Sequence, residues 1–514
     1  MSKTIIIIGA GLAGLSAALQ AAENGCNVKL VSSLPSERAQ SVMAEGGINA
    51  ALNTKDENDS PEEHFTDTIK AACGLADPNA VWGMTQAAPE LVHWLLKLGV
   101  KFNMSGYDDV DLRNFGGQKK KRTAFAQSDT GKQIMTAMID AVRRKEASGM
   151  VERFSHHSFL TLRLCGNICC GCVIRDEYSQ ETVELPGDAV IVATGGMHGL
   201  FGNTTGSLSN TGEVTAELFR LGVPLANGEM IQYHPTTVKC GGKLMLISEA
   251  ARGEGGRLFA MKDGKQWYFM EEKYPELGNL MPRDITAREI WNVSHESEVF
   301  LDMTEISEEI ISNKLSGLAD DCMTYLHKDI RKEPVSVLPG IHYFMGGILV
   351  DEQHRTPIQN LCAAGECCAQ YHGANRLGGN SLLGALYGGR VAAKSACEQA
   401  DVVDLSCATQ IDFPPASQIS EIKQLNKVMQ ETMGVVRNEN TLLNGIQTVQ
   451  ALTGNLPLLG MAVLKSALAR KESRGAHWRE DYPKSNDDDY LKTTVARFDG
   501  KQIQISFVPV PERR

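Results

Sequence analysis

Three glycines near the N-terminus have the spacing that binds the phosphates of a dinucleotide. Gly9, Gly11 and Gly14 form the sequence G-A-G-L-A-G, directly after an apolar strand and at the start of a predicted helix. The first glycine permits a tight turn, the second lets the backbone approach a pyrophosphate, and the third allows the helix to pack closely on the strand. Free N–H groups at the helix N-terminus would then face the phosphates. The sequence therefore predicts a dinucleotide site here.

Two features that usually accompany nicotinamide chemistry are absent from the sequence. The second strand ends Val31-Ser32-Ser33, with no acidic residue to hold the ribose hydroxyls. No second G-x-G-x-x-G follows a strand, although a flavoprotein that is reduced directly by a nicotinamide typically carries a second domain of this kind. Direct reduction by a nicotinamide is therefore not indicated.

The elements that would position this site follow from the hydrophobic periodicity. Residues 4–8, 13–23 and 27–31 form a predicted strand, helix and strand, which together make a βαβ unit. Further helices are predicted at 61–72, 79–98 and 131–145, and successive strands at 151–193. Residues 226–338 mix helices and loops, residues 339–389 return to strand and helix, and the chain from residue 412 is mostly polar helix with a strand-like tail at 502–508.

We predict an α/β protein with a Rossmann-type FAD-binding domain, an inserted α+β capping domain and a C-terminal helical region. The predicted boundaries are 1–225 for the first part of the FAD-binding domain, 226–338 for the capping domain, 339–405 for the second part of the FAD-binding domain, and 406–514 for the C-terminal domain.

Composition excludes several classes of protein. The net charge of -11 and the pI of about 5.6 argue against a nucleic-acid partner. No apolar run approaches the roughly 18 residues that a membrane span needs, so no direct membrane insertion is expected. The apolar N-terminus runs straight into the glycine motif and is interpreted as a buried strand rather than a signal peptide. These features predict a cytoplasmic protein.

Thirteen cysteines are present, without the regular spacing of a disulfide scaffold. The tightest group is Cys165, Cys169, Cys170 and Cys172, in a predicted hairpin over 162–176. Three of these four crowd into four positions, a spacing that suits no metal cluster. The same holds for the vicinal pair at 367–368, which is not a C-x-x-C motif. We predict no metal site, and free thiols that act as small apolar side chains in a reducing compartment.

Several further motifs occur in an order that resembles one known family. The resemblance covers nearly the whole chain and is to the flavoprotein subunit of succinate dehydrogenase and fumarate reductase, and to its relative L-aspartate oxidase. The motifs that carry it are Ala44-Glu-Gly-Gly47-Ile-Asn-Ala, His234-Pro-Thr236, Glu249-Ala-Ala-Arg252-Gly-Glu-Gly-Gly256, Pro282-Arg-Asp284, His342-Tyr-Phe-Met-Gly-Gly347, His372-Gly-Ala-Asn-Arg376-Leu-Gly-Gly-Asn-Ser381 and Glu472-Ser-Arg-Gly-Ala-His477.

The resemblance implies an FAD that lies extended across the Rossmann domain. Glu366 would bind a ribose or ribityl hydroxyl, Thr194 and Gly195 would close the adenine end, and Ser381 and Leu382 would lie against the isoalloxazine. Glu213 takes the place of an aspartate that contacts the cofactor. Further cofactor-binding residues would be Ser32, Ser33, Ser41, Glu45, Gly46, Gly47 and Ser158.

One position departs from the family pattern. Many members attach FAD covalently through a histidine four residues before the A-E-G-G or A-Q-G-G segment, and here that position is Gln40. An amide cannot form the histidyl bond, so noncovalent FAD is expected. His156 and His157 lie far from this position in the sequence and are predicted to be structural.

The resemblance also implies a site for a four-carbon dicarboxylate. His342 and Arg376 would hold one carboxylate, and His234 with Ser248 the other. An arginine suits this role because its planar guanidinium stays charged and meets a carboxylate with two parallel hydrogen bonds. A basic pocket of this kind can exist in an acidic protein. The run at 119–122 (Lys-Lys-Lys-Arg) could add to the field, but a solvated face is the better interpretation.

Proton delivery to the substrate is assigned by the same resemblance to Arg283. The pKa of an arginine is far above 7, so a neighbouring relay must return the proton at once. Glu249 and Arg252 would form this relay, and their i, i+3 spacing places them on one face of a helical turn. The predicted activity is the interconversion of fumarate and succinate, in the direction of fumarate reduction.

Two other enzymatic functions and one non-enzymatic function remain open. L-aspartate oxidase uses a glutamate before a Gly-Gly pair to meet the substrate amino group, but here that position is Phe115, which would leave an ammonium uncompensated. Another unsaturated carboxylic acid is a second alternative. A flavoprotein scaffold that passes electrons without a substrate of its own is the third. By resemblance, an iron–sulfur subunit would supply electrons and hold the chain at the inner face of the membrane.

Overall fold

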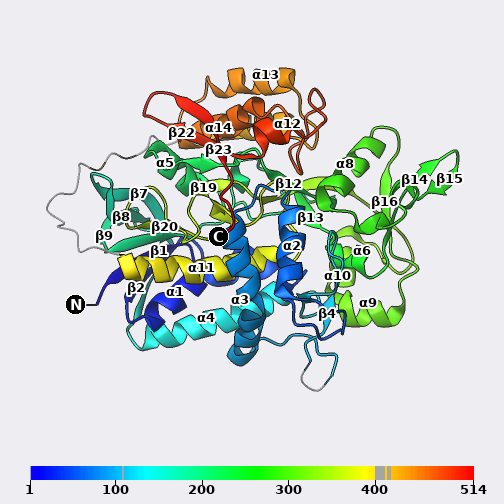
Figure 1. Ribbon diagram of the computed structural model, residues 1–514, viewed down its shortest axis with the longest axis horizontal. Helices are drawn as coiled ribbons and strands as arrows, with labels where there is room; N and C mark the ends of the chain where they lie inside the picture. Colours follow the sequence, from blue (N-terminus) through cyan, green and yellow to red (C-terminus); the bar gives the residue numbers. More distant parts are fainter. Residues whose placement is uncertain (1, 107–108, 400–410, 412, 414–417) are drawn as a thin grey trace.

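A five-stranded parallel sheet lies in the part of the molecule that is drawn at the left of Figure 1. The computed structural model describes residues 2–106, 109–399, 411, 413 and 418–514. Hydrogen bonds join the strands in the order β20-β10-β1-β2-β6, and every neighbouring pair is parallel. The bounds are β1 Thr4–Ile8, β2 Asn27–Ser32, β6 Val151–Ser155, β10 Ala189–Val192 and β20 Leu361–Ala363.

The two faces of this sheet are buried against different layers. Ile5 and Ile7 of β1 pack among helices, whereas Ile6 and Ile8 pack on an antiparallel sheet, as the alternation of side chains along a strand requires. The helices are α1 Leu12–Glu23, α2 Pro61–Ala71, α3 Pro78–Leu98, α4 Thr130–Ala147 and α11 Asn380–Gln399. The antiparallel sheet is β7 His157–Cys165, β8 Ile168–Asp176 and β9 Thr182–Pro186. A small sheet of β3 Ile48–Asn49, β4 Leu112–Arg113 and β5 Thr123–Ala124 adjoins the helical layer.

A capping region built from the middle of the chain lies beside the parallel sheet (Figure 1, green). It contains two antiparallel sheets and several short helices; one sheet shares a core with the short helices, and the other also packs against the C-terminal helices. One sheet is β12 Ile231–Cys240, β13 Lys243–Leu246 and β18 Leu338–Phe344; the other is β14 Arg257–Lys262, β15 Lys265–Trp267, β16 Val299–Asp302 and β17 Val335–Ser336. The helices are α6 Glu249–Gly253, α7 Phe269–Lys273, α8 Arg283–Val293, α9 Glu308–Lys314 and α10 Ser316–Asp321.

The C-terminal part is helical, but it also completes a sheet whose other strands come from earlier in the chain. Its helices are α12 Ile419–Thr432, α13 Glu439–Val449, α14 Asn455–Ala469 and α15 Asp487–Tyr490. Its strands β22 Lys492–Phe498 and β23 Ile503–Pro509 extend the sheet formed by β11 Leu225–Ala226, β19 Gly347–Leu349 and β21 Cys368–Ala369. Helix α5 Glu213–Arg220 packs against α14 in the same core.

The predicted architecture is confirmed, because a Rossmann-type sheet, a capping region and a C-terminal helical part are all present. The βαβ unit, the three long helices and the hairpin at 162–176 form within a few residues of their predicted bounds. The predicted domain boundary at 405–406 lies outside the described residues. No helix in the described part of the chain has the length and apolar character to cross a membrane.

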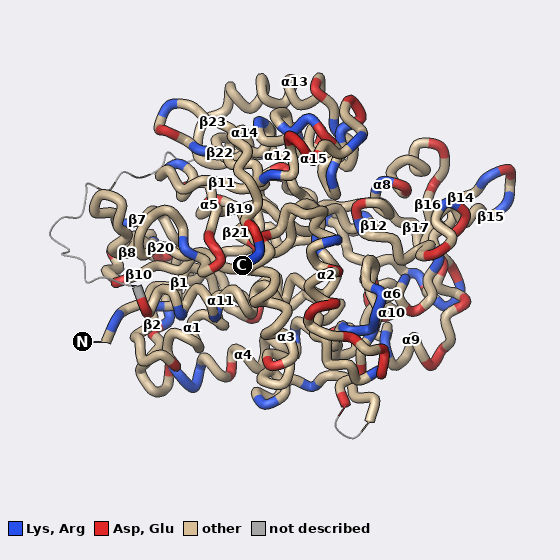
Figure 2. The backbone as a smooth tube through the Cα atoms, viewed as in Figure 1, with Lys and Arg blue, Asp and Glu red and all other residues tan. Residues whose placement is uncertain are grey.

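Two expectations about side chains are wrong. Cys165 is disulfide-bonded rather than free, whereas its hairpin neighbours Cys169, Cys170 and Cys172 are buried free thiols. In the run at 119–122, Arg122 is not part of a solvated face but fully buried. Charges of both signs are otherwise interspersed along the backbone in the view of Figure 2.

Arg122 holds together two segments through buried carboxylates. Its guanidinium donates to Asp59 at 2.9 and 3.1 Å and lies 2.9 Å from Asp67 within α2. Burial raises the pKa of both aspartates even though Arg122 opposes the shift. Removing the arginine would therefore leave two buried acids without compensation.

We expect the substitution Arg122→Met to lower the free energy of unfolding by about 3–5 kcal/mol, the range found when one partner of a buried ion pair is lost. Urea denaturation of the cofactor-loaded protein measures this. Lys121→Met is the matched control, because the Lys121–Glu57 pair is partly exposed and 3.9 Å long, so its loss should cost no more than about 0.5 kcal/mol. Equal midpoints for the two variants would contradict the structural role of Arg122.

Candidate functional site

One cavity of about 1240 Å³ runs from the carboxyl ends of β1, β2 and β10 to the capping region. In doubly wound folds, ligands bind at this edge of the parallel sheet. The predicted cofactor residues that line it are Gly9, Gly11, Ser32, Ser33, Ser41, Glu45, Gly46, Gly47, Ser158, Thr194, Gly195, Glu213, Glu366, Ser381 and Leu382. The predicted substrate and proton-transfer residues that line it are His234, Ser248, Glu249, Arg283, His342 and Arg376.

Two predicted site residues, Gly14 and Arg252, do not line the cavity. A Cβ atom on Gly14 would lie 1.8 Å from the carbonyl oxygen of Gly9, so this glycine permits close packing of α1 on β1 rather than ligand contact. The side chain of Arg252 is buried behind Glu249. Its effect on any ligand must therefore pass through Glu249.

The glycine loop has the shape that an extended dinucleotide needs. Gly9 has φ +111°, and a Cβ there would lie 2.2 Å from the carbonyl oxygen of Ala193. By contrast, a Cβ on Gly11 would meet nothing closer than 3.7 Å, because this position opens into the cavity at the N-terminus of α1. The Oγ atom of Ser32, at the end of β2, is buried without a protein partner. A long cavity with an open helix N-terminus and a spare hydroxyl fits FAD.

His156 and His157 also line the cavity, next to Ser158. They were predicted to be structural because they lie far from the flavin-linking position in the sequence. The parallel pairing of β6 with β2 brings the end of β6 beside Ser32, and the chain continues from there through His156 into β7. No local sequence pattern indicates this, because it depends on the order of strands in the sheet.

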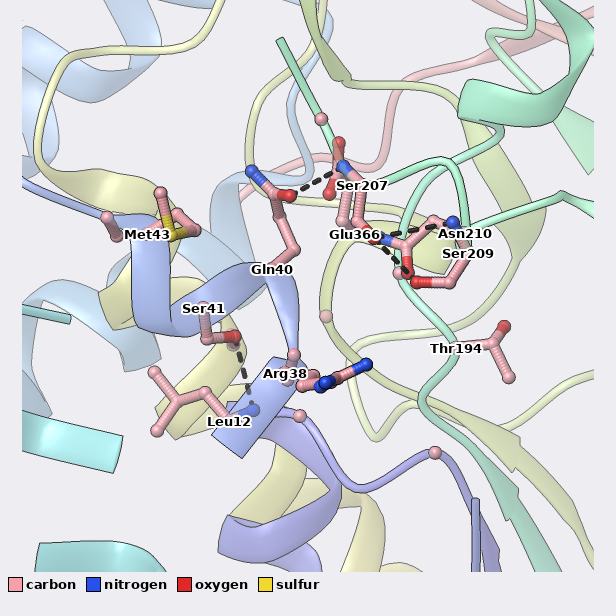
Figure 3. Close-up of a pocket in the computed structure, with 18 of the residues that line it drawn as sticks. Leu12, Arg38, Gln40, Ser41, Met43, Thr194, Ser207, Ser209, Asn210 and Glu366 are labelled. Atoms are coloured by element: carbon pink, nitrogen blue, oxygen red, sulfur yellow. Dashed lines mark hydrogen bonds between the residues drawn. The ribbon is translucent and has the colours of Figure 1, made fainter. Parts of the chain in front are cut away.

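Gln40 occupies the position of the flavin-linking histidine and makes a defined contact (Figure 3). Its Oε1 atom accepts a hydrogen bond of 2.6 Å from the backbone N–H of Ser207. The hydroxyls of Ser207 and Ser209 lie 2.5 Å apart in the same loop. The amide therefore ties the segment 204–211, which forms one wall of the cavity, to the 3₁₀ turn at Gln40–Met43.

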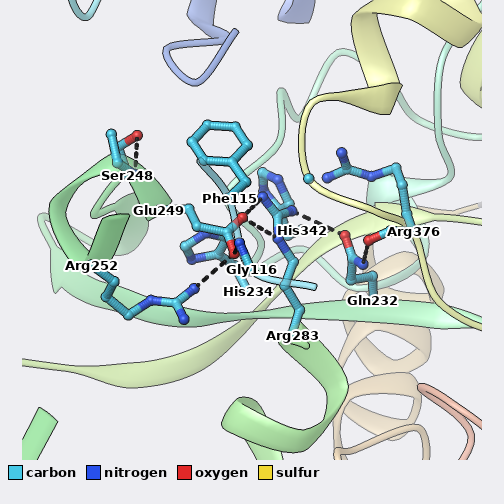
Figure 4. Close-up of polar contacts among 12 residues, drawn as sticks. Phe115, Gly116, Gln232, His234, Ser248, Glu249, Arg252, Arg283, His342 and Arg376 are labelled. Carbon is cyan, nitrogen blue, oxygen red and sulfur yellow. Dashed lines mark hydrogen bonds and ion pairs between the residues drawn. The ribbon is translucent and has the colours of Figure 1, made fainter. Parts of the chain in front are cut away.

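A buried carboxylate lies between two guanidinium groups at the capping end of the cavity (Figure 4). Glu249 Oε2 accepts from Arg283 Nη2 at 2.5 Å and Nε at 2.8 Å. Glu249 Oε1 accepts from Arg252 Nη2 at 3.2 Å and from the backbone N–H of Gly116 at 3.2 Å. Burial by itself would raise the pKa of Glu249, but Arg283 and Arg252 together lower it below its ordinary value. The carboxylate is therefore ionised at neutral pH.

Two helices position this cluster: α6 carries Glu249 and Arg252, and α8 begins with Arg283. Ser248 caps the N-terminus of the short helix α6 by accepting from the N–H of Ala250, and α6 presents Glu249 and Arg252 on one face. Arg283 is the first residue of α8, after Pro282. The predicted i, i+3 relationship of Glu249 and Arg252 is present in the structure.

Two histidines and an arginine face the same space. The rings of His234 and His342 lie 5.1 Å apart, and Thr205 Oγ1 is 2.8 Å from His342 Nδ1. Burial, followed by the charge of Arg283, holds the pKa of both histidines well below the ordinary value, so both are neutral. Burial and Arg283 also lower the pKa of Arg376 to about 9. Its guanidinium lies 4.3 Å from the ring centroid of Tyr343, and its Nε has no protein partner.

A residue that sequence reasoning missed, Gln232, connects these groups. Its Oε1 accepts from Arg283 Nη1 at 3.1 Å, and its Nε2 donates to the backbone oxygen of Arg376 at 2.9 Å (Figure 4). Gln232 lies on β12, two residues before His234. The i, i+2 spacing on one strand face is the signal that could have identified it.

Phe115 packs closely into the wall of the cavity. Its ring lies so near Gly46 and Gly378 that a Cβ on either would come within 2.9 Å of ring atoms. The side chain is buried, and the neighbouring Gly116 contacts Glu249. The wall next to the buried carboxylate is therefore apolar at the position where a charged side chain would be needed to meet an ammonium group.

Two family models match the chain. A model described as FAD binding domain matches residues 4–382, and one described as fumarate reductase flavoprotein C-term matches residues 452–513. The succinate dehydrogenase flavoprotein subunit of Bacillus subtilis is 38% identical, over 100% of this chain and 98% of the relative. The 8-methylmenaquinol:fumarate reductase flavoprotein subunit of Wolinella succinogenes is 32% identical, over 100% and 92%. A solved structure of a mutated E. coli quinol fumarate reductase covers 99% of this chain and 97% of its own, with a TM-score of 0.90 and 27% identity.

The raised pKa of Glu45 leads us to expect that the binding of small dicarboxylates depends on pH. Burial followed by the charge of Asp321 raises the pKa of its side chain to about 8, although the charge of Arg113 opposes the shift. A carboxyl with a raised pKa is neutral below that pH and charged above it. The same shift makes ionisation costly to the fold, so stability is lost as the pH rises above the ordinary pKa of the group.

We therefore expect the KM for a dicarboxylate anion to rise at least about threefold between pH 7 and pH 9, because the ionised Glu45 repels the ligand across the cavity. Steady-state assays over this range measure the effect. Glu45→Gln carries no titratable group at this position and should give a flat KM profile. An equally steep rise in this variant would show that another group titrates.

Proposed function

Because this chain belongs to the succinate dehydrogenase and fumarate reductase flavoprotein family, we propose that it interconverts fumarate and succinate and works in the fumarate-reducing direction. It is an FAD-dependent oxidoreductase. The observation that carries the proposal is the Arg283–Glu249–Arg252 cluster, which opens through Arg283 into the same cavity as His234, His342 and Arg376. A proton donor and anion-binding groups thus share one space.

The geometry supports a clamp with a cationic end and a neutral end. Arg376 has a guanidinium Nε without a protein partner, and it would hold one carboxylate together with His342. His234 and Ser248 would bind the other carboxylate through neutral hydrogen bonds. A guanidinium meets a carboxylate bidentately, so Arg376 would fix the orientation of the double bond relative to Arg283.

Arg283 would donate the proton to one carbon of the double bond. Its Nη2–H and Nε–H both point to Glu249, so a proton lost from the guanidinium can be replaced through this carboxylate. Arg252 stands behind Glu249 and would return the proton to it in turn. The cluster therefore gives Arg283 a direct route for regaining its proton. Because the pKa of an arginine is far above 7, the guanidinium would release its proton only to the strongly basic carbon that develops in the substrate.

FAD, when bound, supplies the hydride that reaches the other carbon. Gly9, Gly11, Ser32 and Glu366 would hold it along the cavity, with Ser381 and Leu382 beside the isoalloxazine. Because Gln40 cannot form a histidyl bond and instead accepts from Ser207, we propose that the cofactor is held noncovalently.

Phe115 favours fumarate over L-aspartate as the substrate. An amine substrate would place an ammonium near the buried wall formed by Phe115, where the ring offers no counter-charge. The cationic groups Arg283 and Arg376 would also repel it. A dicarboxylate without an amine meets neither penalty.

An iron–sulfur subunit is the proposed electron donor, and it would bring the chain to the inner face of the membrane. The relatives from B. subtilis and W. succinogenes are both named as subunits. Among the described residues, no group of three or more His, Cys, Asp or Glu could hold a metal. A partner protein would therefore supply the electrons.

The purified protein should release its FAD on acid precipitation, leaving the yellow colour in the supernatant, because no covalent bond is available at Gln40. Absorbance of the supernatant and the fluorescence of a denaturing gel measure this together. Flavin fluorescence that migrates with the polypeptide would contradict noncovalent binding.

We expect fumarate reduction to be faster than succinate oxidation when both are assayed with artificial dyes at one pH on one preparation. A covalent bond at the 8α position withdraws electron density and raises the flavin potential, so a noncovalent flavin is a weaker oxidant for succinate and a stronger donor to fumarate. Equal rates in the two directions would contradict the proposed direction.

Arg283→Ala provides the control for the chemistry. This variant should keep its FAD, but its turnover of fumarate should fall by a factor of about 10²–10⁴, the usual contribution of general acid catalysis. Near-normal turnover would show that the proton comes from another group.

A further inference from the structure

A chain of two buried amides connects the proton-donating arginine to a second carboxylate. Gln232 Oε1 accepts from Arg283 Nη1 at 3.1 Å. Gln232 Nε2 donates to Asn375 Oδ1 at 2.8 Å, and Asn375 Nδ2 donates to Asp284 Oδ1 at 2.9 Å. The chain therefore runs Asp284–Asn375–Gln232–Arg283, from a carboxylate through two amides to a guanidinium.

The direction of both amides is fixed by their partners. Nε2 of Gln232 faces two oxygen acceptors, Asn375 Oδ1 and the backbone oxygen of Arg376, while its Oε1 faces a guanidinium. Asn375 donates to a carboxylate at one end and accepts from Gln232 at the other. Neither amide can be rotated by 180° without placing like groups together. Gln232 is 0% exposed and Asn375 3% exposed, so both amides are shielded from bulk solvent.

We propose that this amide chain is an electrostatic positioning device that couples the charge of Asp284 to Arg283 and, through Gln232, holds the proton donor and the carboxylate clamp in one fixed geometry. This inference rests on the proposed function of Arg283 and Arg376. Gln232, Asn375 and Asp284 are positioning residues within it, because they act on the substrate through the two arginines.

The charges around the cavity show why such a device is needed. Arg283, Arg252 and Arg376 are all buried, and Glu249 is the carboxylate in direct contact with the first two. Arg283 and burial already depress the pKa of Arg376 to about 9. Two aligned amides in a low-dielectric interior transmit the field of a carboxylate, because each hydrogen bond polarises the next. Asp284 thus stabilises the charge of Arg283 from outside the cavity.

The chain also links the two functional arginines mechanically. Nε2 of Gln232 donates both to Asn375 and to the backbone oxygen of Arg376. Asn375 and Arg376 are adjacent in the loop after β21, whereas Gln232 lies on β12 and Arg283 begins α8. A shift of Gln232 would therefore move Arg283 and the clamp together. Amide groups do not relay protons readily, so the proton return remains with Glu249.

Exchanging the carboxylate at position 284 and the amide at position 375 tests the proposal. Asn375→Asp places a carboxylate against Asp284 and should reduce kcat for fumarate by about tenfold or more, the cost of a hydrogen bond that involves a charged group. Asp284→Asn should also reduce kcat. In the double variant Asp284→Asn/Asn375→Asp, the new amide at 284 can donate to the new carboxylate at 375, which still accepts from Gln232. Turnover should therefore return to within about threefold of the wild type.

The recovery in the double variant would show that the two side chains act on turnover through the hydrogen bond between them, because losses at independent sites would add. Since Arg283 acts in the transition state, kcat should fall more than KM rises in the single variants. Thr237→Val is the matched control: Thr237 is also buried on β12, and its hydroxyl bonds only to the Leu338 backbone, so its loss should leave kcat within about twofold. A double variant no more active than Asn375→Asp, with FAD content retained, would overturn the proposal.

Malonate binding, followed by the flavin absorbance, gives a second readout that needs no turnover. Asn375→Asp should weaken malonate binding by about tenfold, because Gln232 also holds Arg376, and the double variant should restore it. If the wild type bound malonate but did not reduce fumarate, the proposed function would fail while the malonate series still tested the amide chain. Unchanged malonate affinity in Asn375→Asp, together with unchanged kcat, would reject the chain itself.

Discussion

The contact between Glu249 and Arg283 is the interaction on which the site depends. A carboxylate removed from water is stable only if it is paired and its remaining lone pairs are satisfied, and Glu249 meets this condition with two guanidinium groups and a backbone N–H. The requirement brings together α6, α8 and the segment at Gly116, which together span more than 160 residues of chain, from Gly116 to Arg283. The hydrogen bonds of Glu249 to these segments hold the capping region over the cavity.

The same constraint sets the electrostatics of the cavity. The chain carries a net charge of -11, yet the capping end of the cavity concentrates three buried arginines around one carboxylate. Burial, followed by the positive charge of Arg283, keeps His234 and His342 neutral, and the excess of positive charge prepares the space for an anion with two charges. Glu45 lies at the edge of this region, where burial and Asp321 favour its neutral form. A net acidic chain and a cationic site are thus compatible, because water and salt screen exposed charges beyond about 10 Å, whereas the buried charges of the site act at close range.

The cofactor end of the cavity follows a different physical rule. There the backbone, rather than charged side chains, defines the site: Gly9 adopts a conformation that other residues avoid, and α1 opens its N-terminus to the space beside Gly11. Gln40 holds a wall segment through the hydrogen bond that it accepts from the N–H of Ser207. The flavin that we propose to be noncovalent would then be retained by the cavity as a whole.

The sequence by itself determined the features whose physics is local. The glycine motif, the βαβ unit, the 162–176 hairpin and the i, i+3 pair of Glu249 and Arg252 were all predictable, because each depends on residues within a few turns of one another. The residues of the predicted clamp could be named only through the family resemblance. Tertiary structure alone decided that Arg252 acts from behind Glu249, that Arg122 is buried between Asp59 and Asp67, and that Gln232 joins Arg283 to Arg376. Each of these depends on which distant charge or amide lies opposite, and that is fixed by the packing of elements rather than by any local pattern.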